Sequence, residues 1–133
     1  GSLAGVRKGA VVAVPEGLVG RVTSVTPHTS EITLVTDPSV KVACEVEGET
    51  RAFGIVAGCG DEVLAIRHLR GGAGLRPRSR VLTSGRGGVF PPGLEVGTLL
   101  DVRQDARGFA GEGEVLPQVD FSTLEDVFIR RER

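Results

Sequence analysis

The stretch Val40–Cys59, VKVACEVEGETRAFGIVAGC, decides the fold class of this chain of 133 residues. In its first half the apolar residues recur at every second position, so that Val42, Cys44 and Val46 share one face. A period of two is typical of a β-strand with one buried side. The segment 47–50 is rich in glycine and polar residues and predicts a turn. The stretch therefore predicts an antiparallel hairpin.

The second half of the hairpin, Arg51–Cys59, alternates in the same way. The residues that we expect on one face of this strand are Phe53, Ile55, Ala57 and Cys59. In such a hairpin Cys44 lies opposite about residue 53, which disfavours a direct cross-strand bond to Cys59. A contact over a longer range, or one disulfide in an oxidising compartment, stays open.

Working outward, similar short runs bounded by Gly, Pro, Asp and Ser predict further strands. They are expected over Ala10–Val14, Leu18–Val25, Glu31–Thr36, Val63–His68, Arg80–Thr83, Leu94–Val102, Glu114–Val119 and Val127–Arg130. A polar hairpin tip is expected over 108–113. Ser122 and Glu125 have capping-box spacing, so Asp120–Glu125 is expected to form one helical turn. About ten short strands without a long helix predict an all-β protein, an antiparallel barrel or sandwich.

The composition excludes several classes of protein. The chain is 40% hydrophobic and 25% charged, which rules out a disordered polymer. No apolar run reaches the ~20 residues that span a bilayer. The net charge is −1 and the chain contains neither Tyr nor Trp, so we expect no nucleic-acid partner. Two cysteines and two histidines lack metal-site spacing, and we expect neither a metal nor a cofactor.

Charge is distributed unevenly along the chain. Arginine recurs through residues 67–86, including a glycine- and arginine-rich segment at 70–78 that we interpret as a mobile surface loop. Acidic residues gather at 45–49 and 61–62. Each cluster is typical of a solvated face, but opposite charge on two regions also permits head-to-tail contact between copies.

One enzymatic alternative remains, a serine hydrolase. Ser84 is followed by glycines whose backbone amides could form an oxyanion hole. The candidate partners are His28, His68, Asp37, Asp61 and Asp101. The competing interpretation is that 83–85 ends a strand and the glycines form turns. We favour this second interpretation over the hydrolase, because any chain of this size contains a serine, a histidine and an aspartate that could be combined into a triad.

The stretch Thr83–Thr98, TSGRGGVFPPGLEVGT, closely resembles a signature of the MreC family of rod shape-determining proteins. Val14–Val22, Leu34–Pro38 and Asp120–Val127 resemble three further blocks of that family, in the family's order. The segment 69–80 departs from the family pattern, because Arg78-Ser79 replaces its usual Gly-Asp. The resemblance marks these residues as a structural signature: Pro15, Gly17, Gly20, Asp37, Pro38, Thr83, Ser84, Gly85, Gly87, Gly88, Phe90, Pro91, Gly93 and Gly97.

The resemblance implies a fold of two small antiparallel β-barrels, similar to the chymotrypsin-like barrel topology without a catalytic triad. We expect the first barrel to comprise residues 3–38 and 94–133, with 39–93 forming the second; a consecutive division stays open. Gly1-Ser2 is typical of residues left by cloning, and we exclude it from the fold.

The resemblance also implies a function by binding rather than catalysis. The expected partners are the elongation penicillin-binding transpeptidase, MreD, MreB and other Rod-complex proteins, and further copies of the chain. Family members act on the periplasmic, extracytoplasmic face of the bacterial inner membrane, anchored by one N-terminal helix that a coiled coil follows. We expect this chain to be the domain that follows both.

The signature also has a physical interpretation. Glycine permits sharp turns and close backbone approach, while Pro91 and Pro92 fix φ and hold a stiff turn. Phe90 is one of five aromatic residues and is expected to plug a barrel or the junction between two barrels. We therefore expect these residues to supply rigidity and not reactivity.

Overall fold

The computed structural model describes residues 7–71, 75–104 and 110–121, and these contain nine strands. The strands are β1 (Val11–Val14), β2 (Gly17–Val25), β3 (Ser30–Leu34), β4 (Lys41–Val46), β5 (Ala52–Gly58), β6 (Leu64–Gly71), β7 (Arg80–Thr83), β8 (Glu95–Gln104) and β9 (Ala110–Pro117). Every strand pair is antiparallel. The all-β class predicted from the alternation is confirmed.

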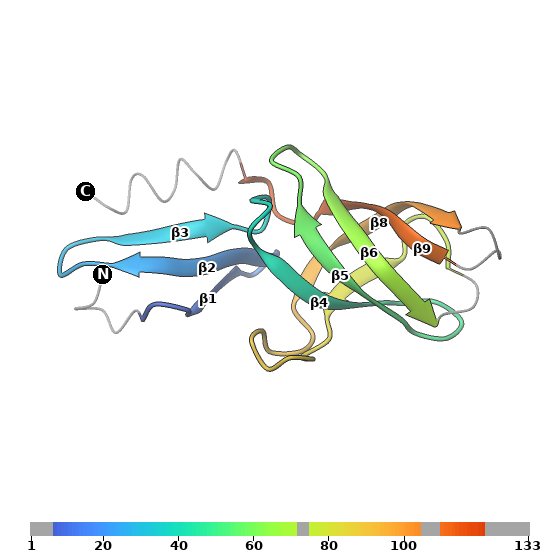
Figure 1. The fold of residues 1–133 in the computed structure, drawn as a ribbon, viewed down its shortest axis with the longest axis horizontal. Helices are drawn as coiled ribbons and strands as arrows, with labels where there is room; N and C mark the ends of the chain where they lie inside the picture. The colour runs from blue at the N-terminus through green and yellow to red at the C-terminus, as the bar shows by residue number, and fades with distance from the viewer. Residues whose placement is uncertain (1–6, 72–74, 105–109, 122–133) are drawn as a thin grey trace.

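The strands form two units of different kinds (Figure 1). Strands β1, β2 and β3 form an open sheet in that order, and the other six close into a barrel in the order β4-β5-β6-β9-β8-β7. The barrel closes because β7 pairs with β4 as well as with β8. Closure leaves the barrel without a free edge, whereas β1 and β3 remain edges of the sheet.

The expected division of the chain differs from this arrangement. The sequence predicts that residues 94–133 belong to the first unit. In the structure β8 pairs with β7, and β9 pairs with β6. The expected boundary at 93/94 therefore falls inside the barrel. The described part of the first unit is an open sheet and not a second barrel. Burial explains the pairing, since Leu99 and Val115 are fully enclosed by the barrel strands. Alternation along one strand indicates its buried face but not its neighbour.

The hairpin of β4 and β5 forms as predicted, with one correction. Val42, Cys44 and Val46 are buried, and Cys44 pairs with Gly54. In β5 the buried face is the one opposite to that expected. The buried residues are Ala52, Gly54, Val56 and Gly58, while Phe53, Ile55 and Ala57 lie half-exposed on the outside. On the inner face of β5, Gly54 lies close to the Arg67 carbonyl oxygen and Gly58 lies close to the Thr36 backbone. These two positions have no room for a larger side chain.

A β-bulge in β6 explains the narrow space at Gly54. The pairing register of β5 and β6 shifts between Phe53 and Ile55, and His68 adopts a positive φ of 59°. The extra residue leaves Arg67 and His68 both exposed while Leu69 returns to the core. A Cβ on Gly54 would come within 2.9 Å of the Arg67 carbonyl oxygen. Strand β6 consequently extends to Gly71, three residues beyond the predicted end.

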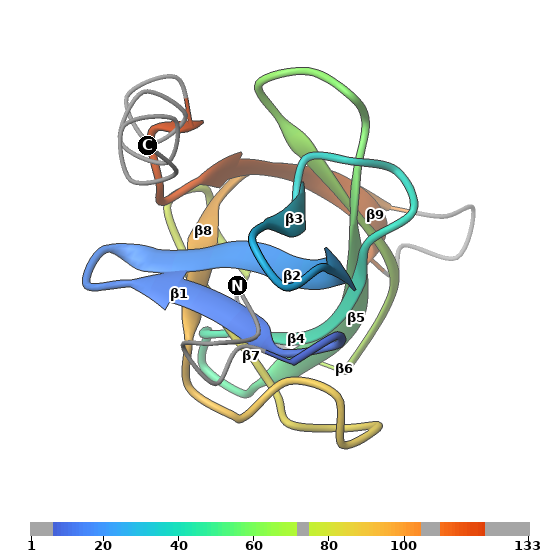
Figure 2. The same cartoon turned by 90° about the vertical axis from the view of Figure 1, so that its left-hand side faces the viewer.

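The sheet joins the barrel at one end, and Figure 2 shows it lying across that end. Leu18 of β2 and Val35 after β3 belong to the same buried cluster as the barrel residues. A Cβ on Gly17 would overlap the Glu95 carbonyl oxygen, and one on Gly58 would overlap the Thr36 backbone. These two glycines therefore let the strands of the two units approach more closely than any side chain would allow.

Two predictions near the C-terminus have separate outcomes. Strand β9 begins at Ala110 instead of Glu114, so the expected tip at 108–113 is partly strand. The helical turn over Asp120–Glu125 lies outside the described residues beyond Phe121, and so does the strand over Val127–Arg130.

Candidate functional site

The signature segment forms a loop that returns on itself between β7 and β8. The Thr83 side chain, which is fully buried, donates a hydrogen bond to the Pro91 carbonyl oxygen (2.6 Å) and accepts one from the Leu94 amide (2.9 Å). The Gly93 amide donates to the Thr83 carbonyl oxygen (2.9 Å), and the Ser84 amide donates to Ala43 of β4 (2.9 Å). The base of the loop is therefore fixed on both sides.

The glycines and prolines of this loop have the backbone geometry that such a turn requires. Gly85, Gly87, Gly88 and Gly93 all have positive φ angles between 72° and 87°. A Cβ on Gly85 would come within 3.0 Å of the Pro92 ring, so the start and end of the loop lie against each other. The conformation of the loop accounts for these residues without a catalytic role, since each one shapes the backbone.

Phe90 anchors the loop to the rest of the molecule. Its side chain is 5% exposed and packs in the shared core, and the Arg21 guanidinium of β2 lies 5.8 Å from the ring centroid. Its neighbour Val89, in contrast, is 48% exposed at the loop surface. Phe90 therefore lies where the loop, the sheet and the barrel meet, which agrees with the expected position at a junction between units.

A second contact fixes the outer side of the loop. The Arg86 guanidinium lies 3.6 Å from the centroid of the Phe53 ring on the outside of β5, which is a cation–π distance. From the sequence alone, Phe53 is expected on the apolar face of its strand, and Arg86 is one of the arginines that recur through residues 67–86. The contact between Arg86 and Phe53 cannot be predicted from a local sequence pattern, because 33 positions separate the two residues.

The remaining signature residues lie in turns and at close backbone contacts of the sheet and the barrel. Pro15 forms the exposed β1–β2 turn, and Gly20 is buried in β2 where a Cβ would overlap the Thr33 carbonyl oxygen. Gly97 of β8 faces β9 in the same close manner. Asp37, followed by Pro38, accepts hydrogen bonds from the Ser39 amide (2.8 Å) and hydroxyl (2.7 Å). These bonds, the amide first, lower the pKa of the Asp37 carboxyl below its ordinary value.

The residues of the hydrolase alternative are distributed over separate elements. Ser84 is half-buried, and its side-chain oxygen accepts a hydrogen bond from the Arg86 amide (3.2 Å). His28 lies in the β2–β3 turn, at the end of the sheet that points away from the barrel (Figure 1), and His68 lies in the β6 bulge. In the described ranges no hydrogen bond joins Ser84 to a histidine. The arrangement does not support a catalytic triad.

Both thiols are free, as the hairpin register indicated. Cys44 is buried, and burial raises the pKa of its thiol to about 12. Cys59 follows the end of β5 and is exposed.

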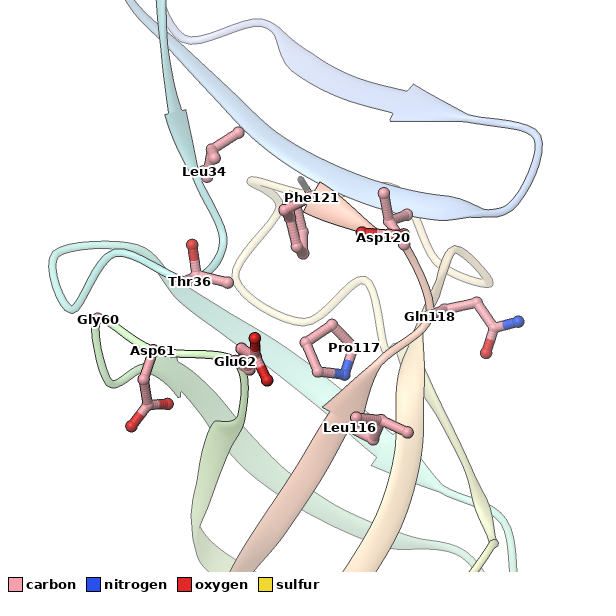
Figure 3. Close-up of a pocket in the computed structure, with 11 residues that line it drawn as sticks. Leu34, Thr36, Gly60, Asp61, Glu62, Leu116, Pro117, Gln118, Asp120 and Phe121 are labelled. Atoms are coloured by element: carbon pink, nitrogen blue, oxygen red, sulfur yellow. The ribbon is translucent and has the colours of Figure 1, made fainter. Parts of the chain in front are cut away.

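A groove of about 580 Å³ lies where β3, the β5–β6 turn and the end of β9 converge (Figure 3). Its apolar surface includes Leu116, which is 47% exposed, and the half-buried Phe121. Asp61 and Glu62 form an exposed acidic rim, and the Asp61 carboxylate accepts a hydrogen bond from the Val63 amide (3.0 Å). An exposed leucine beside an aromatic ring and carboxylates is suited to binding another protein, not to bond chemistry.

Nothing in the sequence indicates this groove. Its lining comes from three segments that are distant in the chain, and the acidic residues 61–62 were interpreted as a solvated face. Only an exposed apolar residue at a strand position, such as Leu116, could have suggested a contact surface.

The described residues contain neither a metal-binding group of side chains nor a helix that could cross a membrane. No group of three or more histidine, cysteine, aspartate or glutamate side chains is placed to hold a metal ion in ranges 7–71, 75–104 and 110–121. Over the same part of the chain, no helix has the length and hydropathy needed to cross a membrane.

Comparison with known proteins identifies a family. The model of the rod shape-determining protein MreC, barrel core, matches residues 1–131. The cell shape-determining protein MreC of Listeria monocytogenes is 32% identical over 133 residues, which cover 97% of this chain and 45% of that protein. This chain therefore spans less than half the length of that relative.

Solved structures agree with the sequence match. The structure of MreC from Listeria monocytogenes superposes with a TM-score of 0.78 at 31% identity, over 90% of this chain and 59% of that chain. A complex between penicillin-binding protein 2 and MreC from Helicobacter pylori matches with a TM-score of 0.61 at 17% identity, over 79% of this chain and 64% of that chain. At that identity the second match shows the fold alone.

Proposed function

The chain belongs to the MreC family of rod shape-determining proteins, and from that premise we propose that it is a non-enzymatic scaffold of the bacterial elongation (Rod) complex. In this role it binds the elongation penicillin-binding transpeptidase and holds it in its active state. The observation that carries the proposal is the family match over residues 1–131. The Helicobacter pylori relative, which was solved in complex with penicillin-binding protein 2, supports the choice of partner.

The groove of Figure 3 is where we place the contact with the transpeptidase. Leu116 supplies an exposed apolar anchor, while Asp61 and Glu62 supply charge at the rim. An apolar centre with a polar rim is the usual organisation of a protein interface. Activation follows if the scaffold binds the active conformation of the enzyme more tightly than the inactive one.

Self-association is the second part of the proposal. The barrel is closed, so the edges of the open sheet, β1 and β3, are the strands available for pairing with another copy. Exposed sheet edges associate through main-chain hydrogen bonds. MreD and MreB complete the proposed assembly, in which this chain lies on the periplasmic, extracytoplasmic face of the inner membrane.

Calorimetric titration of the transpeptidase ectodomain into this chain, at two salt concentrations, tests the proposal. We expect saturable binding that Leu116→Glu weakens at least tenfold. The matched control is Leu100→Glu, since Leu100 is 41% exposed on β8 and lies outside the groove lining. Absence of binding by the unmodified chain contradicts the proposed partner. Equal weakening by the two variants contradicts the proposed surface.

A further inference from the structure

A second groove, of about 410 Å³, lies on the other side of the junction between the sheet and the barrel. It is formed by the segment before β1, the middle of β2 and β3, and the start of β4. The segment before β1 is held against β2 by hydrogen bonds from the Gly9 amide to the Val22 carbonyl oxygen (2.7 Å) and from the Val22 amide to Ala10 (2.9 Å). Backbone hydrogen bonds therefore fix the wall of the groove on the side of the sheet.

The groove carries concentrated positive charge in a chain whose net charge is −1. Lys8, Arg21 and Lys41 line it, and no carboxylate is part of its lining. The ion pairs found among the described residues join Arg51, Arg80 and Arg103 to glutamates, and none of them includes a cation of this groove. Three cations from three different segments thus converge without a charge partner in the described part of the chain.

Arg21 is the cation whose contacts with the described residues are defined. Its guanidinium lies against the Phe90 ring and donates one long hydrogen bond to the Gly9 carbonyl oxygen (3.4 Å). The Nε atom is buried and has no hydrogen-bond partner among the described residues. A guanidinium offers five donors, and a buried donor without an acceptor is costly. The site therefore has donor capacity that the described residues do not use.

Hydroxyl groups extend the polar lining. Thr23 and Thr33 lie on adjacent strands with their hydroxyl oxygens 3.1 Å apart, and Ser39 lines the groove beside Lys41. The carboxylate at this border, Asp37, is occupied by the amide and hydroxyl of Ser39. These hydroxyls donate within the protein, so the cations are the groups that would bind a phosphate, through charge-assisted hydrogen bonds.

We propose that this groove, formed by Lys8, Arg21 and Lys41, binds a phosphate group carried by a small molecule, a polymer or a lipid. Three cations match the charge of a phosphate better than that of a single carboxylate. The groove is larger than an inorganic phosphate ion, so it has room for a phosphate that is the end of a larger ligand. The proposal is independent of the contact with a transpeptidase, which we place in the other groove.

Titration with inorganic phosphate, followed by two-dimensional amide NMR at constant ionic strength, tests the site. We expect saturable shifts at Gly9, Thr23 and Lys41 that sodium chloride does not produce. The variant carrying Lys8→Gln and Lys41→Gln removes two exposed cations, and we expect at least a tenfold loss of affinity. The matched control carries Arg67→Gln and Arg70→Gln, which remove two exposed cations of β6, and we expect less than a twofold change.

Arg21→Lys is a further variant that keeps the charge but loses the planar donors. Its unfolding curve, recorded alongside, separates lost binding from lost folding, since Arg21 also contacts Phe90. Shifts that chloride reproduces, or equal losses in the lysine and arginine variants, would overturn the proposal.

Vesicles identify the source of the phosphate. Co-sedimentation with phosphatidylglycerol vesicles that depends on Lys8 and Lys41 indicates a lipid headgroup. Phosphate binding without such sedimentation indicates a soluble phosphate-bearing ligand, and both results support the site. The third outcome is that the arginine control variant and the lysine variant lose sedimentation equally and phosphate produces no saturable shifts. This outcome indicates unspecific charge attraction and contradicts the proposed site.

Discussion

The hydroxyl of Thr83 donates a 2.6 Å hydrogen bond to the carbonyl oxygen of Pro91, across the base of the loop between β7 and β8. The same oxygen accepts from the Leu94 amide, so one buried side chain satisfies a carbonyl and an amide of the returning chain. This bond joins the start of the loop to its returning segment, and it explains why a threonine precedes the Ser-Gly pair.

Replacing Thr83 by valine tests this role. The substitution keeps the shape but leaves the Pro91 carbonyl and the Leu94 amide without a partner, so we expect a loss of about 2–4 kcal/mol in the free energy of unfolding. Urea denaturation measures it. Thr33→Val is the control, since its hydroxyl bonds the exposed hydroxyl of Thr23, and it should cost less than ~1 kcal/mol. Similar losses in both variants would refute the bridging role.

Replacing Phe90 by alanine empties the position where loop, sheet and barrel meet. We expect the free energy of unfolding to fall by about 3–5 kcal/mol, because a buried aromatic ring is lost and a cavity remains. Val89→Ala, one residue away and 48% exposed, should change it by less than about 0.5 kcal/mol. An unchanged melting curve for Phe90→Ala would show that the ring does not anchor the loop.

The close approach of the sheet and the barrel predicts that one added methyl group at Gly58 lowers the stability of the fold. Gly58→Ala places a Cβ against the Thr36 backbone, so we expect a loss of roughly 1–3 kcal/mol from overpacking. Gly111→Ala is the control, because a Cβ there meets nothing within 4 Å. Thermal unfolding compares the two proteins. If alanine at 58 were as stable as alanine at 111, the sheet and the barrel would not be in the contact described.

The buried thiol of Cys44 predicts a dependence of stability on alkaline pH. Its pKa is about 12 in the folded chain against the ordinary value of 9.0 for a cysteine thiol, so above pH 9 the unfolded chain releases a proton that the folded chain keeps. Stability from this group is complete below pH 9 and is lost as the pH rises toward 12, by ~1.4 kcal/mol per pH unit.

The comparison that isolates this effect is denaturation of the unmodified chain and of Cys44→Ala between pH 8 and 10.5. The alanine variant should show a flatter profile. A thiol reagent at pH 8 should modify only Cys59 in the folded protein, because Cys59 is the exposed thiol. Parallel pH profiles, or two thiols modified at equal rates, would contradict the burial of Cys44.

Local chemistry made much of this structure predictable from sequence. The alternation of Val42, Cys44 and Val46 identified both a strand and its buried face, and glycine and proline located the signature turn. Prediction was wrong for β5, where it assumed that Phe53 must lie inside. The buried side of that strand follows its register with β4, in which Gly54 lies opposite the buried Cys44 and Val56 opposite the buried Val42.

The candidate sites were less predictable than the fold. Leu116 and Asp61 line one groove, and Lys8 and Lys41 line the other, but these pairs are 55 and 33 positions apart. Which strands become neighbours is decided by burial of the whole core, not by any segment alone. The same limit explains the misplaced boundary at 93/94, because β8 and β9 complete a barrel that begins at β4.

The central claim is that this chain acts by binding a transpeptidase and performs no chemistry itself. The most direct measurement is the rate of peptidoglycan cross-linking by the purified elongation transpeptidase, with increasing amounts of this chain. We predict a saturable increase in rate that Ser84→Ala leaves unchanged and Leu116→Glu reduces. An unchanged rate at saturating scaffold, or a stimulation that Ser84→Ala abolishes together with labelling by a fluorophosphonate probe, would contradict the account.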